Sequence, residues 1–108
     1  MSEVLRRVSA LAAIGAVEVT QHGFRELSAD DILVDDILAG LESAIVVEDY
    51  PDAKRGPSVL VLQRDRDNNP IHLVWGIPRG ADAPAVLIAA YRPDPLRWSS
   101  DFTRRRPT

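Results

Sequence analysis

The hydrophobic period of this chain changes once, from helical to extended, at about Gly40, and this change limits the possible fold classes most. Before Gly40, apolar residues recur every three or four positions, as they do on one face of a helix. After it, four apolar runs of strand length follow one another, separated by turn residues such as Pro51, Gly56 and Pro70. Helices followed by strands are typical of an α+β domain. We therefore expect two N-terminal helices packed on a four-stranded antiparallel β-meander.

The first helix is expected to run from Ser2 to about Ile14. Ser2 is a suitable N-cap residue, and Gly15 is placed to end the helix. Residues 17–20 then alternate like a short extended segment, and Thr20 is placed to cap a single helical turn after it.

The second helix is expected over residues 29–41. Ser28 followed by Asp31 resembles a capping box in which aspartate replaces glutamate. The expected core stripe of this helix is Val34, Ile37, Leu38 and Leu41.

The expected strands cover residues 45–47, 58–64, 71–77 and 85–91. In the third strand, Trp75 shares a face with Ile71, Leu73 and Ile77, which favours a core position for this tryptophan. The second strand is apolar on both faces, and two helices cover only one face of a sheet. The other face is therefore expected to bury against a second copy of the chain, which predicts a homodimer.

Length and composition limit the number of domains and the chemistry. A chain of 108 residues has enough surface to bury for one core, so we expect a single domain with a core over about 3–92 and an arginine-rich tail over 93–108. The chain has no cysteine and only two histidines. We expect no metal, no cofactor and no membrane span, and a reducing, cytoplasmic location.

Charge is distributed unevenly along the chain. Residues 18–52 contain ten acids and one base, a net charge of −9. Residues 92–108 contain five arginines and two acids, a net charge of +3. A polyanion such as RNA is therefore expected to approach the C-terminal end.

Several short motifs carry a resemblance to a known family. They lie at residues 20–27 (TQHGFREL), 28–32 (SADDI), 48–51 (EDYP), 70–76 (PIHLVWG) and 90–93 (AYRP). Together they resemble the domain-of-unknown-function family labelled four-two-five-eight, over about residues 17–106. That family is itself similar to small bacterial toxins of the RelE and BrnT type. The resemblance implies a compact helix-then-sheet ribonuclease scaffold, with RNA as a substrate and an antitoxin-type protein as a partner.

Metal-free RNA cleavage needs a base, an acid and a cation that stabilises the phosphorane. His22, Tyr91 and Arg92 are the candidate catalytic residues, since a histidine can transfer the proton and a phenol beside a guanidinium can hold a phosphate. The candidate substrate-binding residues are Arg25, His72, Arg104 and Arg105. The acidic balance keeps a second hypothesis open, a non-catalytic, self-associating interaction module on the same scaffold.

Overall fold

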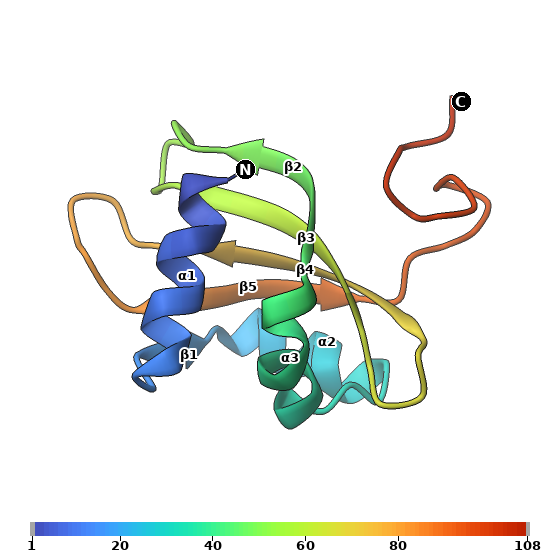
Figure 1. The fold of residues 1–108 in the computed structure, drawn as a ribbon, viewed down its shortest axis with the longest axis horizontal. Helices are drawn as coiled ribbons and strands as arrows, with labels where there is room; N and C mark the ends of the chain where they lie inside the picture. The colour runs from blue at the N-terminus through green and yellow to red at the C-terminus, as the bar shows by residue number, and fades with distance from the viewer. Residues whose placement is uncertain (1, 108) are drawn as a thin grey trace.

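The computed structural model describes residues 2–107, which form three α-helices and one five-stranded sheet (Figure 1). In chain order, the elements are α1 (Glu3–Ala13), β1 (Val17–Val19), α2 (Gln21–Ala29), α3 (Val34–Gly40), the 3₁₀ turn η1 (Leu41–Ser43), β2 (Ile45–Tyr50), β3 (Ser58–Arg64), β4 (Pro70–Gly76) and β5 (Ala85–Tyr91). The α+β class is therefore confirmed. None of the helices in this part of the chain combines the length and apolar character needed to cross a membrane.

The sheet is mixed, with the strand order β1-β5-β4-β3-β2, so the predicted four-stranded antiparallel meander is wrong. Strands β2 to β5 do form an antiparallel meander. The difference is β1, which pairs in parallel with β5, placing Val17 opposite Ala85. The sequence marks residues 17–19 as extended, but three residues carry no signal for a partner almost 70 positions away. This pairing brings the N-terminal segment to the strand that ends at Tyr91.

The bounds predicted for the second helix are wrong, because residues 21–40 form two separate helices, α2 and α3. Thr20 caps α2, because its Oγ1 accepts the Gly23 N–H at 2.9 Å. That helix ends at Ala29, and Asp31 adopts a φ of 52°, which a helix cannot contain. The Ser28–Asp31 pattern therefore lies at a helix end, and α3 starts later, without a capping side chain.

The first helix was predicted correctly. Ser2 accepts the Leu5 N–H at 3.1 Å, and Gly15 ends the turn with a φ of 75°. Helices α1 and α3 cover one face of the sheet and lie in front of it in Figure 1, while α2 lies along the edge of β5. Between these layers lies a core that includes Val8, Ile37, Leu73 and Trp75, each at most 1% exposed. In the predicted stripe of the second helix, Ile37 and Leu41 are buried and Leu38 is exposed.

We call the face of the sheet opposite the helices the outer face, and residues 93–107 the C-terminal hook. The hook turns back on itself, because the Ser99 N–H donates to Arg104 O and the Arg106 N–H donates to Arg97 O, both at 2.8 Å. Figure 1 shows it beyond the end of β5, where the chain is red. Trp98 from the hook is 4% exposed, and Leu62 beneath this end of the outer face is 3% exposed. The segment expected as a tail is therefore packed on the sheet.

Candidate active site

His72 lies at the centre of the polar groups on the outer face. Its side chain is fully buried. Its Nε2 lies 2.8 Å from Phe102 O and its Nδ1 lies 3.1 Å from the Tyr91 hydroxyl. A backbone carbonyl can only accept, so Nε2 carries the proton and Nδ1 accepts from the phenol. His72 is therefore a neutral imidazole that orients the Tyr91 side chain.

Burial fixes the protonation states of this pair. Loss of solvent lowers the pKa of His72 below its ordinary value, because the charged imidazolium is poorly solvated there. Burial raises the pKa of Tyr91 for the same reason, since the phenolate is the charged form. At neutral pH, the phenol therefore keeps its proton and the imidazole remains neutral.

Beside this pair, an arginine from the hook meets a carboxylate from β2. Arg105 donates from Nε to Glu48 Oε2 at 2.8 Å and from Nη2 to Glu48 Oε1 at 2.9 Å. The Tyr50 hydroxyl donates to the same carboxylate. These contacts, with the Arg105 bond contributing most, lower the pKa of Glu48, so the group is ionised at neutral pH. The guanidinium also stacks on Trp98, with Cζ 4.8 Å from the ring centroid.

We define the outer-face cluster as Glu48, Tyr50, His72, Tyr91 and Arg105. Trp98 connects the Glu48–Arg105 pair to the His72–Tyr91 pair. The Arg105 guanidinium stacks on the Trp98 ring, and this ring meets His72 edge-on, with the ring centroids 4.4 Å apart. The Tyr91 phenol belongs to the cluster through its hydrogen bond to His72. The cluster therefore combines a carboxylate, a guanidinium, an imidazole and two phenols from β2, β4, β5 and the hook.

Sequence reasoning identified His72, Tyr91 and Arg105 but missed Glu48 and Tyr50 as site residues. A signal for both was present. They lie two positions apart on β2, so both face the same side of the sheet. A carboxylate and a phenol on the same face of one strand indicate that this face of the sheet is polar near the end of β2.

The predicted catalytic residue His22 lies on α2, away from the cluster contacts. Its Nε2 pairs with Glu26 Oε1 at 3.0 Å, and its side chain is 68% exposed. Arg25 is exposed on the same helix, and Arg104 is exposed in the hook. Of the seven predicted residues, the structure brings three together in the cluster: His72, Tyr91 and Arg105.

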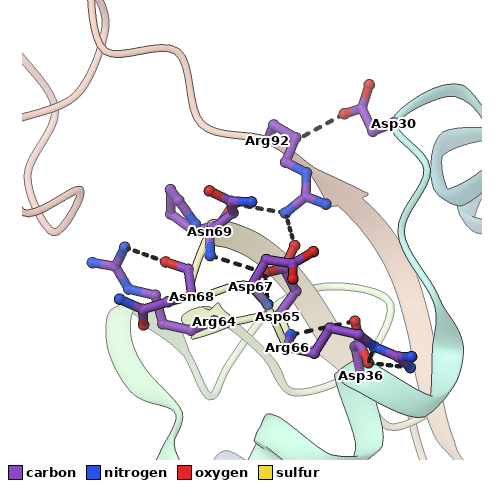
Figure 2. Close-up of polar contacts among 10 residues, drawn as sticks. Asp30, Asp36, Arg64, Asp65, Arg66, Asp67, Asn68, Asn69 and Arg92 are labelled. Atoms are coloured by element: carbon purple, nitrogen blue, oxygen red, sulfur yellow. Dashed lines mark hydrogen bonds and ion pairs between the residues drawn. The ribbon is translucent and has the colours of Figure 1, made fainter.

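Arg92 contacts a different set of groups from Tyr91, although the two are adjacent in sequence. Figure 2 shows its guanidinium directed at the β3–β4 turn, where Nη1 lies 2.8 Å from Asp65 Oδ2. Asp65 also accepts the Asp67 and Asn69 N–H groups at 2.9 Å. Burial opposes this, but the Asn69 N–H and the Arg92 guanidinium hold the pKa of Asp65 below its usual value. Arg92 therefore braces a turn, and its cation is neutralised there.

The end of β5 is held by side chains of α2 beyond the point where β1 stops. Glu26 Oε1 accepts the Ala90 N–H at 3.1 Å, and Asp30 Oδ2 accepts the Arg92 N–H at 3.0 Å. The spacing matches, because four helical residues rise about 6.0 Å and two strand residues about 6.8 Å. We call this pair the α2 carboxylate clamp. It fixes the strand end that carries Tyr91.

Charge is segregated between the two sides of the molecule. The helical layer, residues 2–44, contains eight acids and three bases, a net charge of −5. The hook contains four arginines and two acids, a net charge of +2. Within residues 2–107, no group of three or more histidine or acidic side chains is arranged to hold a metal ion. The outer face is therefore the side on which an anionic ligand is least repelled.

Burial of neutral His72 predicts that stability depends on pH. Its pKa is lowered in the folded state, so the unfolded chain binds more protons below about pH 6.5. The free energy of unfolding should therefore rise with pH below about pH 6.5, by at most about 1.4 kcal/mol per pH unit, and level off above it. Urea midpoints of wild type and His72→Gln measure this. An equal pH dependence in both proteins would contradict the assignment.

A family model described as Domain of unknown function (DUF4258) matches residues 19–92. The match covers more than half of the chain, so this protein belongs to that family, as the motifs of the sequence indicated. The matched region contains four residues of the cluster, Glu48, Tyr50, His72 and Tyr91, while Arg105 lies beyond it. No significant match was found among curated proteins. No significant match was found among solved structures.

Proposed function

We propose that this domain is a metal-free endoribonuclease of the toxin-like type and that the outer-face cluster is its site. The observation that carries the proposal is the bidentate contact of Arg105 with Glu48, which Trp98 and His72 connect to the Tyr91 phenol. Base, acid and cation are the three groups that cleavage of an RNA phosphodiester needs without a metal.

Each group has the protonation state that its role requires at neutral pH. Ionised Glu48 accepts the proton of the 2′-hydroxyl, the 2′-oxygen attacks phosphorus, and the bond from phosphorus to the 5′-oxygen breaks. The Tyr91 hydroxyl, which donates to His72 Nδ1 in the free protein, turns its O–H to the departing 5′-oxygen and gives this proton to it. The products are a 2′,3′-cyclic phosphate and a 5′-hydroxyl. Exchange with solvent then removes the proton from Glu48 and returns one to Tyr91.

Arg105 retains donors for the phosphorane while it holds Glu48. A guanidinium has five N–H groups, and the two contacts with Glu48 use one from Nε and one from Nη2. Three N–H groups remain. The low pKa of Glu48 and the high pKa of Tyr91 make these groups a weak base and a weak acid, so we expect slow cleavage.

The test is cleavage of single-stranded RNA by the full chain in the presence of EDTA. We expect fragments that end in a 2′,3′-cyclic phosphate, and no cleavage of a DNA strand of the same sequence, which lacks the 2′-hydroxyl. Fragments with other ends, or activity that EDTA removes, would rule out this chemistry.

A non-catalytic interaction module is the second candidate, and one observation favours it. Glu48 neutralises Arg105, and Asp65 neutralises Arg92, so two of the cations nearest the sheet end are already paired. Under this alternative, the outer face binds a partner, and wild-type protein leaves the RNA intact in the assay above.

A further inference from the structure

We propose that an apolar hollow next to the outer-face cluster binds a base of single-stranded RNA. The proposal rests on the proposed function, because it identifies how the same face would hold the substrate. The hollow has a volume of about 280 Å³ and is lined by Arg55, Pro57, Ser58, Gly76, Val86 and Ile88. This volume is just below the range of ligand pockets for whole drug-sized molecules, about 300–1,000 Å³, and suits one flat group.

The register of the sheet places the hollow directly beside the cluster. Tyr50 pairs with Ser58, Ser58 with Gly76, and Gly76 with Val86, so these residues form one row across four strands. Glu48 belongs to the next row, two residues along β2, which is about 6.8 Å away. Ser58 and Gly76 are also one and two strands from β2, at about 4.8 Å each, so a group in the hollow is about 8–12 Å from the backbone of Glu48. It would belong to a nucleotide one or two units from the cleaved bond.

The floor and the wall of the hollow are formed by two glycines. Gly76 lies in the floor, and a Cβ there would come within 2.8 Å of Ile88 Cδ1. Gly56 lies in the wall with a φ of 132°, and a Cβ there would come within 2.0 Å of Ile77 O. Because no larger residue fits at Gly56, the loop packs closely against the end of β4. The loop side of the hollow is therefore fixed by backbone packing, while the Ile88 side chain forms part of its lining.

The charges around the hollow indicate an anionic ligand. Arg55 lines the hollow, and Lys54 and Arg79 line an adjoining pocket that shares Gly56 and Pro57 with it and also contains Asp52. None of these three bases forms an ion pair within the described residues 2–107. On the cluster side, the exposed ring of Tyr50 offers a stacking surface. An apolar hollow for a flat group, with cations on its loop side and an aromatic ring on its cluster side, matches a chain of phosphates that carries unpaired bases. A duplex does not fit, because its bases are stacked on one another.

Binding of a labelled 2′-O-methyl hexauridylate, measured by fluorescence anisotropy, tests the proposal. This strand has no free 2′-hydroxyl, so it reports binding without cleavage. Filling the hollow with Ile88→Trp should weaken binding about 5- to 150-fold, the loss of one stacked base. Ile14→Trp makes the same change at a residue that is 77% exposed on the helical side, and it should leave binding unchanged. Ser58→Phe fills the hollow from another strand and should act like Ile88→Trp.

The salt dependence of binding by a charge variant is a second measurement. Arg55→Glu should reduce the salt dependence of binding, lowering the slope of log K against log salt by about 0.7 for one lost phosphate contact. Arg7→Glu, in the helical layer, is the matched control. Equal binding by wild type and both filled variants, or equal binding of single strand and duplex, would overturn the proposal.

The outcome for the hollow and the outcome for the cleavage site can be separated. Cleavage that persists at the wild-type rate in Ile88→Trp would remove the base site and leave the nuclease proposal intact. Binding that depends on Ile88, in a protein that does not cleave RNA, would retain the base site and remove the nuclease. An acidic peptide with an aromatic side chain that binds in place of the oligonucleotide would assign the hollow to a protein partner and overturn the proposal.

Discussion

Cleavage by Glu48→Gln is expected to be about 10²- to 10⁴-fold slower than by wild type, the usual loss when a general base is removed. Glutamine keeps the size of the side chain and a hydrogen-bond acceptor for Arg105, so the hook should stay in place. Glu42→Gln is the matched control, because Glu42 is an exposed carboxylate in the helical layer. Rates are measured on labelled single-stranded RNA under single-turnover conditions. A Glu48→Gln rate within threefold of wild type would exclude this residue as the base.

The pH profile distinguishes this base from a histidine. The Arg105 contact lowers the pKa of Glu48, and burial raises the pKa of Tyr91. Both groups therefore hold their active forms between about pH 5 and 9, and the rate should be level across that range. It should fall in acid as Glu48 gains a proton, and in base as Tyr91 loses one. A rate that rises through about pH 6.5 would instead indicate an imidazole base and return attention to the sequence-predicted His22.

Trp98→Ala is expected to destabilise the packing of the hook by about 3–5 kcal/mol, the cost of removing a buried aromatic side chain. Trp98 is 4% exposed and contacts both His72 and Arg105. Water that enters its place would also restore solvation to the imidazole, so the pKa of His72 should rise towards 6.5.

Two measurements check this prediction. Denaturant unfolding gives the loss of stability, and the NMR titration of His72 reports whether the hook has opened. The matched control is Leu96→Ala, since Leu96 lies in the same hook but is 84% exposed. An unchanged His72 titration in Trp98→Ala would mean that the hook does not depend on this ring.

The parts of the fold predicted well were those with a strong local pattern. β3 and β5 have the predicted bounds because each is a continuous apolar run between turn residues. Trp75 is in the core, as its alternation with Leu73 predicted. The α2–α3 region was predicted poorly because Asp31, whose positive φ separates the helices, also fits the pattern of a helix start.

The site was harder to predict because its geometry is made by long-range contacts. Glu48 and Arg105 are 57 positions apart, and His72 and Phe102 are 30 apart. Arginines near a chain end resemble a solvated tail, and only the burial of Trp98 reveals that this tail is packed. The residue types indicated the chemistry. The contacts between these residues depend on how the C-terminal hook folds back onto the sheet.

The α2 carboxylate clamp has a consequence for assembly in solution. Exposed strand edges are where proteins aggregate, because their free N–H groups recruit a strand from another molecule. Glu26 and Asp30 occupy those N–H groups at the end of β5, so an incoming strand would have to displace two carboxylates before it could pair. On the opposite side of the sheet, β2 is interrupted by a bulge between Val46 and Glu48, which breaks the regular ladder that a second strand would need. Strand pairing between molecules is therefore disfavoured at these two places on the sheet edges.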